Sequence, residues 1–150
     1  MTTEVTFKTL SADIVRCNLA AFIAVASDIP GEYWAAENFL AERPEKWRFS
    51  YYACRDDELA GYAILSRKAE SCVHLHHFMV ARAHRNQGLG DRMVGEFLSR
   101  CQAAHVGSVT LKTQRTNSGA IRFYDRFGFK KIACEGEYIV MAKLLDGRAS

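Results

Sequence analysis

The sequence predicts a single α/β (α+β) domain over residues 1–150, built on a central mixed sheet of about seven strands with four helices. The length of 150 residues suits one domain. Hydrophobic residues make up 49%, aromatic residues 11% and charged residues 25%, which is typical of a globular chain and excludes disordered, fibrous and membrane classes. Strand-like and helix-like segments follow one another in the order β-α-α-β-β-β-α-β-α-β-β.

The N-terminal third predicts one strand and two helices. Apolar and polar residues alternate over 5–9, as in a half-buried strand. Ser11 is a candidate N-cap for a helix whose apolar residues recur at helical spacing, and the Asp28-Ile29-Pro30-Gly31 turn ends that helix. A shorter helix is expected from about Glu32 to Glu42, because Pro44 disfavours helical backbone before it.

The remainder predicts six strands and two helices. The predicted strands lie at 49–55, 59–67, 72–81, 109–113, 129–134 and 138–145. The predicted helices run from Leu89 to His105, with one apolar face, and from Asn117 as N-cap to about Phe127, before Gly128. The strand–helix–strand unit at 72–113 should be a right-handed crossover with parallel strands, and the other neighbours should pair antiparallel.

The fourth strand carries a slip in its alternation. Apolar residues occupy odd positions at Val73 and Leu75 but even positions at Phe78 and Val80, so the phase changes at His76-His77. An extra residue of this kind predicts a β-bulge, and bulges are frequent beside active sites. A strand buried on both faces would also lack alternation.

A glycine-containing loop separates this strand from the long helix. In Arg82-Ala-His-Arg-Asn-Gln-Gly-Leu-Gly90, two glycines and a polar run precede a helix N-terminus, where free amides and the helix dipole favour an anion. A Walker loop is excluded because Glu96-Phe97 follow Gly95, and a dinucleotide fingerprint is excluded because Met93 replaces its third glycine. Taken alone, the loop is equally compatible with a plain tight turn.

The wider set of motifs resembles the GNAT superfamily of acetyl-CoA-dependent N-acetyltransferases. The R/Q-x-x-G-x-G/A loop of that family is matched from Arg85 to Gly90. Its N-x-x-A-x-x-x-Y-x-x-x-G-F segment is matched without gaps from Asn117 to Phe129. The resemblance implies the GNAT acyl-CoA N-acyltransferase fold, with a bulged fourth strand, and acetyl-CoA as the co-substrate.

The resemblance also implies a cofactor site and a catalytic acid. Backbone amides of the loop would hold the pyrophosphate of coenzyme A, and the end of the fourth strand would bind the pantetheine arm. The expected cofactor-binding residues are Phe78, Met79, Val80, Arg85, Asn86, Gln87, Gly88, Leu89, Gly90, Asn117 and Tyr124. Tyr124 would also act as general acid toward the leaving thiolate. Because Asn117 and Tyr124 are about two helical turns apart, they should share a face; a core tyrosine with a bonded hydroxyl is the alternative for Tyr124.

The general base is left open between two histidines and water. An attacking amine must lose a proton, and His76 or His77 could accept it because histidine titrates near neutrality. Many family members use a glutamate near this strand, and this strand has none. The alternative is that the histidines only line the cleft while a water chain removes the proton. No metal site is expected, since His-x-His-His has only Cys72 nearby as a further ligand.

The expected reaction is transfer of an acetyl group to a primary amine of a small molecule by direct attack. Acetylation of peptide or protein N-termini is the alternative enzyme, and a non-catalytic acyl-CoA-sensing module is the alternative from another class. Carboxylates and aromatic rings that could meet an amine occur in the N-terminal half: Asp28, Glu32, Tyr33, Trp34, Glu37, Trp47, Phe49, Tyr51 and Tyr52. No acceptor is named, and a homodimer is left open because many relatives dimerise.

Charge and cysteine usage bear on partners and compartment. The net charge of +3 is too small to indicate nucleic acid binding. Residues 82–130 carry nine Lys or Arg against three Asp or Glu, a net +6, so the remainder carries −3 and is the half expected to meet an amine. The five cysteines are scattered and are expected to be small buried hydrophobes in a reducing compartment. With no signal peptide or membrane span apparent, a cytoplasmic protein without membrane partners is expected.

Overall fold

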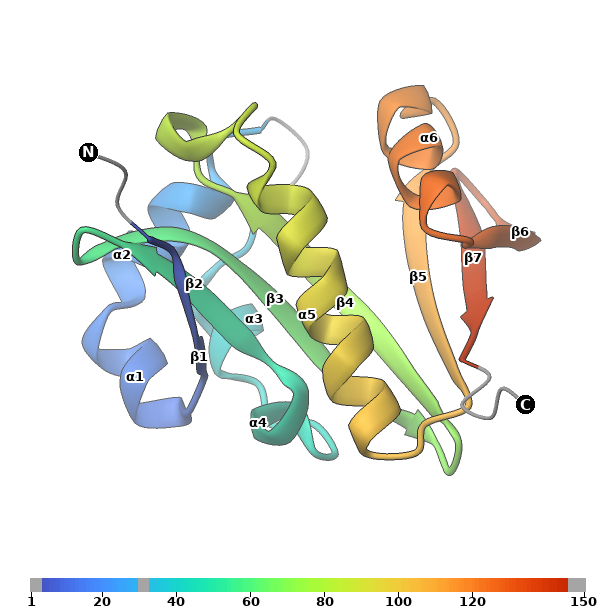
Figure 1. Cartoon of the computed structure of the whole chain (residues 1–150), viewed down its shortest axis with the longest axis horizontal. Coiled ribbons are helices and arrows are strands. Elements are labelled where there is room, and N and C mark those ends of the chain that lie inside the picture. The colour runs from blue at the N-terminus through green and yellow to red at the C-terminus, as the bar shows by residue number, and fades with distance from the viewer. Residues whose placement is uncertain (1–3, 30–32, 146–150) are drawn as a thin grey trace.

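The computed structural model describes residues 4–29 and 33–145, which form a seven-stranded mixed sheet with helices on both faces (Figure 1). The strand order is β1-β2-β3-β4-β5-β7-β6. The strands are β1 Thr6–Thr9, β2 Tyr51–Arg55, β3 Glu58–Ala69, β4 Cys72–Val80, β5 Ser108–Gln114, β6 Lys130–Glu135 and β7 Tyr138–Leu144. Only β4 and β5 pair parallel; every other neighbouring pair is antiparallel, as the sequence predicted.

The described residues contain six α-helices, two more than predicted. They are α1 Ala12–Cys17, α2 Leu19–Ala26, α3 Ala36–Leu40, α4 Lys46–Phe49, α5 Leu89–Ala103 and α6 Ser118–Arg126, with a 3₁₀ turn, η1, at Arg82–His84. The predicted first helix is divided at Asn18, whose side-chain amide donates to the Ile14 carbonyl at 2.8 Å. Asparagine competes with the helix for backbone partners in this way, and the chain turns there. The Pro30-Gly31 part of the turn predicted to end this helix, and the predicted start of the next helix at Glu32, lie outside the described residues.

Helix α4 replaces the predicted start of the second strand. Lys46 is buried, and its ammonium donates to the carbonyls of Phe39 and Ala41 at 2.6 and 2.7 Å. A lysine of this kind satisfies carbonyls left free at the end of α3. Phe49, which was expected in the strand, packs from α4 into the core. The sequence could not indicate this, because a lysine is usually solvated.

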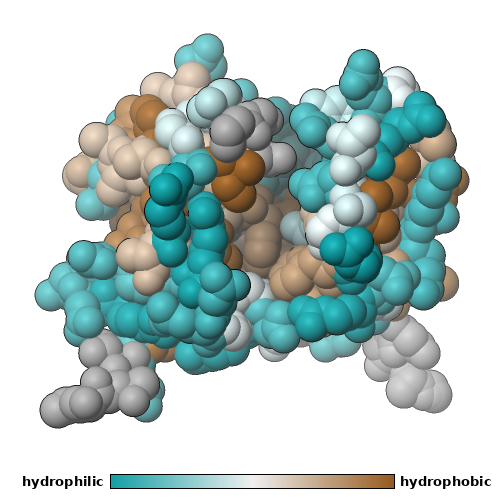
Figure 2. Space-filling view, turned by 90° about the horizontal axis from the view of Figure 1, so that it is seen from above, coloured by the Kyte–Doolittle hydropathy of each residue, from teal (hydrophilic) through white to brown (hydrophobic). Residues whose placement is uncertain are grey.

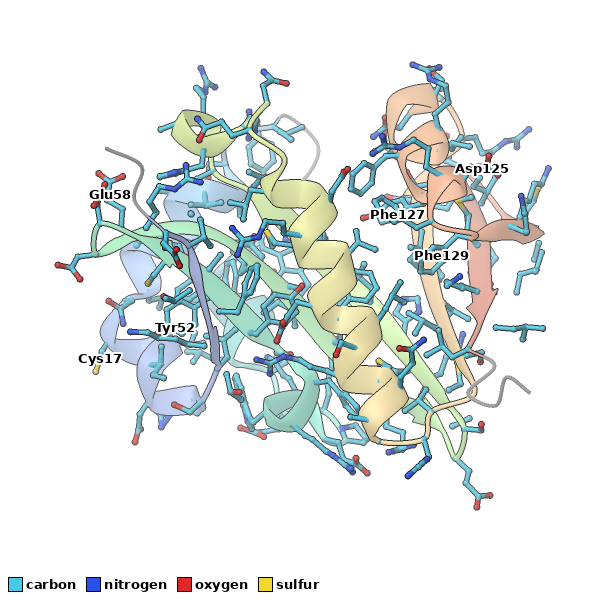
Figure 3. All side chains as sticks on the ribbon, in the orientation of Figure 1. Cys17, Tyr52, Glu58, Asp125, Phe127 and Phe129 are labelled. Carbon is cyan, nitrogen blue, oxygen red and sulfur yellow. The ribbon has the colours of Figure 1, made fainter. Side chains whose placement is uncertain are left out.

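Two cores lie on opposite faces of the sheet. Helix α5 covers one face of the central strands and contributes Met93, Val94 and Phe97. Helices α1 to α3 cover the other face, where Phe22 and Phe39 pack on Tyr62 of β3. Figure 3 shows Phe127 and Phe129 at the end of α6, and Phe129 is fully buried against Phe97 of α5. Packing through Phe129 therefore joins α6 to α5.

The exposure of the cysteines differs from what the sequence predicted. Of the five cysteines, only Cys101 is buried, whereas Cys17 and Cys134 are exposed, so the expectation of buried thiols was wrong for most of them (Figure 3). No helix in the described part of the chain is long and apolar enough to span a membrane.

Candidate active site

A cleft opens where β4 and β5 separate. The parallel ladder between them covers only Cys72–Leu75 and Ser108–Leu111, so among the described strands none pairs with the second half of β4 on that side. A cavity of about 300 Å³ fills the gap. It is lined by Ile29, Leu75, His76, His77, Phe78, Met79, Val80, Arg85, Gly90, Leu111, Lys112, Thr113, Asn117, Ala120, Phe123 and Tyr124. Figure 2 looks into the molecule from the α6 end and shows this hollow between two halves, with apolar residues in its floor.

The predicted bulge lies beside this cavity. Ile64 of β3 pairs with His77 and Leu65 pairs with Leu75, so His76 is the extra residue. Before the bulge, Val73 and Leu75 face the α5 core; after it, Met79 faces the core of α1 to α3. The phase slip in the sequence is therefore confirmed as a bulge. Its consequence is that two consecutive histidines line the cleft.

His76 has an environment that keeps its ring neutral. Its Nε2 lies 2.6 Å from the Ser66 hydroxyl, and its ring packs edge-on against His74 at 4.9 Å. Burial, followed by the charges of His74, Arg43 and nearby lysines, lowers the pKa of His76 to about 3. In the tautomer whose Nε2–H donates to the Ser66 hydroxyl, Nδ1 is the nitrogen that could take a proton. A neutral ring can do so at physiological pH, but its low pKa makes it a weak base.

His77 is held in a stack of rings. Trp34 lies parallel to it at 4.5 Å, with an angle of 12° between the rings, and Tyr62 lies on it at 5.6 Å. The Tyr62 hydroxyl and the His77 Nδ1 are 2.8 Å apart. These contacts fix the ring of His77 and make it part of the packing between β4 and α3. The two histidines named as candidate bases therefore have different surroundings.

Asn117 and Tyr124 both line the cleft from α6, as expected for residues that share a helix face. Asn117 caps α6, with its side-chain oxygen accepting from the Ala120 amide at 3.0 Å. That bond orients the side chain and leaves its amide nitrogen for a ligand. The ring of Tyr124 packs edge-on against Phe78 of β4 and Phe129, at 6.2 and 5.7 Å. Aromatic packing thus holds Tyr124 at the cleft wall opposite β4.

The glycine loop forms the outer end of the same cleft. A second cavity of about 310 Å³ shares Val80, Arg85, Gly90 and Phe123 with the first. Gly88 has a φ of +80°, the left-handed backbone that glycine adopts without strain. A side-chain carbon at Gly90 would lie 3.5 Å from the Phe123 ring and would fill space between α5 and α6. The free amides at the start of α5 therefore border an open cavity, which is the arrangement of an anion site.

A polar network supports this loop from behind. Buried His84 lies between Glu58 of the β2–β3 hairpin, at 3.2 Å, and Arg55, at 3.4 Å. Arg55 also donates to the side chain of Gln87.

Three loop residues predicted to bind a cofactor are used structurally through their side chains. Gln87 bonds Arg55, Leu89 is buried in the core, and neither lines either of these two cavities. Arg85 does line the cleft, and its Nε donates to the Val80 carbonyl at 2.9 Å. Gln87 and Leu89 could therefore contribute to a ligand only through backbone amides.

The carboxylates and aromatic rings suggested for an amine are mostly used in packing. Asp28 accepts from the Arg82 backbone amide at 3.1 Å and lies 3.7 Å from the Arg85 guanidinium, so it joins α2 to the glycine loop. Phe49 and Tyr51 are buried in the core. Of this set, Trp34 reaches the site through its stack on His77. Glu32 lies outside the described residues.

The sequence interpretation missed the wall that β5 and α6 supply. Lys112 and Thr113 of β5, and Ala120 and Phe123 of α6, line the cavity. A signal for them existed, because a strand predicted parallel to β4 after a crossover must present its own end beside the histidines. No motif marked those positions, since their residue types are common in any strand or helix.

The joined cavities suit acetyl-CoA. The glycine-loop end offers free amides at a helix N-terminus, and the middle offers Phe78, Val80 and Phe123 beside the unpaired edge of β4. An elongated ligand with an anionic end and an amide-containing arm would match both parts. Among residues 4–29 and 33–145, no group of three His, Cys, Asp or Glu side chains could hold a metal ion.

Solved structures share this fold over nearly the whole chain. The ribosomal-protein-S18-alanine N-acetyltransferase of Escherichia coli has a TM-score of 0.80 at 18% identity, covering 95% of this chain and 94% of that one. The PaiA N-acetyltransferase of Thermoplasma acidophilum, solved with coenzyme A, has a TM-score of 0.76 at 19% identity, covering 94% and 99%. At these identities the likeness concerns the fold.

Sequence comparison gives the family. An uncharacterised protein of Mycobacterium leprae is 29% identical over 130 residues, which are 85% of this chain but 34% of that protein, so the chain spans about a third of its relative. Residues 14–129 match the acetyltransferase (GNAT) family. With its seven-stranded sheet, its bulge at His76 and its glycine loop before α5, the chain belongs to the GNAT acetyltransferase family.

Proposed function

We propose that this protein is an acetyl-CoA-dependent N-acetyltransferase that acts on a primary amine of a small molecule. The observation that carries the proposal is the joined cavity between β4 and β5, which has the N-terminus of α5 at one end and His76, Asn117 and Tyr124 along its length. Acetyl-CoA, when bound, supplies an acetyl group activated as a thioester.

The residues of the cleft have separate roles in this proposal. The amides from Gly88 to Gly90 bind the pyrophosphate, and the free edge of Phe78–Val80 aligns the pantetheine arm. Asn117 donates to that arm from its side-chain nitrogen. The Tyr124 hydroxyl donates its proton to the sulfur as thiolate develops. His76, at Nδ1, accepts the proton of the amine directly or through water, and His77, stacked on Trp34, forms the adjoining wall.

Two measurements test the proposal. Acetyl-CoA should raise the melting temperature by mass action, so no shift at millimolar ligand refutes the cofactor assignment. Release of coenzyme A is then measured over a panel of amines, amino acids and peptides. Small amines as the best acceptors support the proposal, whereas peptides as the best acceptors replace it with N-terminal acetylation.

A Tyr124→Phe variant distinguishes the enzyme from a sensor. This change removes the proposed acid and keeps the ring that packs on Phe78 and Phe129. We expect turnover to fall at least a hundredfold, the usual contribution of a positioned acid, while the acetyl-CoA-induced melting shift is retained. Wild-type protein that binds acetyl-CoA and acetylates nothing in the panel contradicts the enzyme proposal.

A further inference from the structure

A third cavity, of about 360 Å³, lies behind the bulge of β4. Six of its lining side chains are basic or imidazole groups: Arg43, Arg67, Lys68, His74, His76 and Lys112. None of its described lining residues is acidic. We call it the cationic pocket. Because Val73 and Leu75 face α5, strand alternation places His74 and His76 toward the opposite face of the sheet.

The cationic pocket adjoins the proposed reaction site. His76 and Lys112 line both this pocket and the cavity between β4 and β5. They come from the two strands whose separation opens the cleft, so they form a common wall. A group held in the cationic pocket therefore lies within the reach of a short molecule whose other end enters the cleft beside His76.

Two of the cations are not held in an ion pair with a described residue. Arg67 is tied to Glu45 by bonds of 2.9 and 3.0 Å, and the Lys112 ammonium is 2.7 Å from Glu135. In the described part of the chain, Arg43 and Lys68 form no ion pair, and both are exposed at the mouth of the pocket. The pocket thus carries an excess of positive charge that solvent or a ligand must balance.

The histidines of the pocket respond to this charge. Burial, followed by the charges of Lys68, Lys112 and Arg43, lowers the pKa of His74 to about 4, against an opposing effect of Glu135 on β6. The pKa of His76 is lowered by burial first and then by His74, Arg43, Lys46 and Lys68. The groups that face the two rings from β3, β5, α4 and the α3–α4 connection are therefore mainly positive. Their arrangement disfavours a cation and favours an anion.

We propose that the cationic pocket binds a carboxylate or phosphate of the acceptor, so that the acceptor is a small amine carrying a negative charge. This inference rests on the proposed N-acetyltransferase activity and names its substrate class. It reverses the expectation from charge along the sequence, which placed an acidic surface around the amine. An anion in the pocket would also raise the pKa of His76 toward its ordinary range and make it a better proton acceptor.

The test compares amines with and without an anionic group. The pairs are β-alanine with β-alaninamide, for a carboxylate, and phosphoethanolamine with ethanolamine, for a phosphate. We expect the charged member of at least one pair to have a kcat/KM at least tenfold higher, and added salt to reduce that preference by screening. The pair with the larger ratio identifies the anion. Equal kcat/KM within both pairs overturns the inference while leaving the acetyltransferase intact.

Variants connect the preference to the pocket. Arg43→Gln combined with Lys68→Gln removes the two positive charges that form no ion pair among the described residues, both at exposed positions, and Lys8→Gln on β1 is the matched control. We expect the double variant to reduce the preference about tenfold, through KM, since two exposed charges together contribute about that much. The charge-preserving change Arg43→Lys with Lys68→Arg should restore most of the preference. A preference unchanged in the double variant refutes the assignment of the pocket.

A binding measurement separates this inference from the proposed function. Titration calorimetry with phosphoethanolamine and β-alanine, without acetyl-CoA, should give at least tenfold weaker binding to the double variant than to wild type or Lys8→Gln. Binding of this kind without turnover of any amine contradicts the enzyme and supports the pocket. Absence of binding by either compound, or acetylation only of peptides with an acidic first residue, overturns the small anionic acceptor.

Discussion

Gly61 on β3 offers a sharp test of how closely the central strands pack. It pairs with Val80 of β4, at the segment proposed to bind the cofactor arm. A side-chain carbon at Gly61 would lie 2.7 Å from the Met79 carbonyl oxygen and 2.9 Å from the Met93 sulfur. The thioether can rotate away, but the carbonyl belongs to the β3–β4 ladder, so Gly61→Ala must move backbone.

The expected cost follows from that contact. Overpacking of a well-filled core costs about 1–3 kcal/mol, and a backbone contact places Gly61→Ala in the upper half of this range. For a domain of this size, about 2–3 kcal/mol corresponds to a fall of about 5–10 °C in melting temperature. Gly95 in α5 is the matched control, because nothing lies within 4 Å of its would-be side chain. Gly95→Ala should stabilise by about 0.5–1 kcal/mol through helix propensity.

Urea denaturation of the wild type and both variants measures the two changes. We expect opposite shifts in the midpoint at a constant m-value, and we expect Gly61→Ala also to weaken the acetyl-CoA-induced melting shift because it displaces the edge of β4. A Gly61→Ala protein within 0.5 kcal/mol of wild type, beside a Gly95→Ala protein that behaves as expected, refutes the packing described for β3 and β4.

Three further outcomes can be checked. The pKa values of His74 and His76 lie below the unfolded value of 6.5, so the unfolded chain binds more protons than the folded one as pH falls through about 6.5 to 4. The free energy of unfolding should therefore drop by about 2 kcal/mol from pH 8 to pH 5, after allowance for solvent screening. A urea midpoint that stays constant over that range, or a pH dependence unchanged in a His74→Asn, His76→Asn protein, argues against this expectation. Gly88→Ala places a side chain at φ +80° with free space around it, so backbone strain alone should lower the folding stability by about 1–2 kcal/mol. Calorimetry should also show weaker acetyl-CoA binding. A variant with the stability and the acetyl-CoA affinity of the wild type contradicts the loop geometry. Asn117→Ala should lose about 1 kcal/mol of folding stability because it removes the N-cap of α6. Asn117→Asp keeps the cap but loses the amide donor, so its stability should equal that of the wild type while its acetyl-CoA affinity falls. Equal affinity in Asn117→Asp and wild type removes Asn117 from the binding site.

The sequence predicted the sheet and the bulge well because those features depend on local patterns. Strand-like residue runs bounded by turns located the strands, and the slip in alternation on β4 located the extra residue at His76 to within one position. The helices of the N-terminal half were less predictable. The break at Asn18 depends on one side-chain bond to the Ile14 carbonyl, and α4 depends on the burial of Lys46 against the end of α3. Such contacts carry no periodic signal.

The site divides in the same way. Glycine spacing at a helix start indicated the loop, and the resemblance of residues 117–129 to a family motif indicated both α6 residues, which line the cleft. The different surroundings of His76 and His77 were not predictable, since Trp34 and Tyr62 come from distant elements. Nor was the cationic pocket, whose Arg43, Lys68 and Lys112 are separated along the chain and meet only through the order of the strands.

The short parallel ladder between β4 and β5 has a mechanical consequence. It joins β1–β4 to β5–β7–β6 through residue pairs at one end alone, while β5 pairs with β7 along its full length. Each part is therefore a rigid unit, and the ladder together with the α5 connection is the junction between the two units. A ligand that bonds to the free edge of β4 while contacting α6 would connect the two units at the end where no ladder joins them. Under the proposed function, acetyl-CoA in the cleft would then stiffen the whole sheet and fix the distance between the two walls that an acceptor meets.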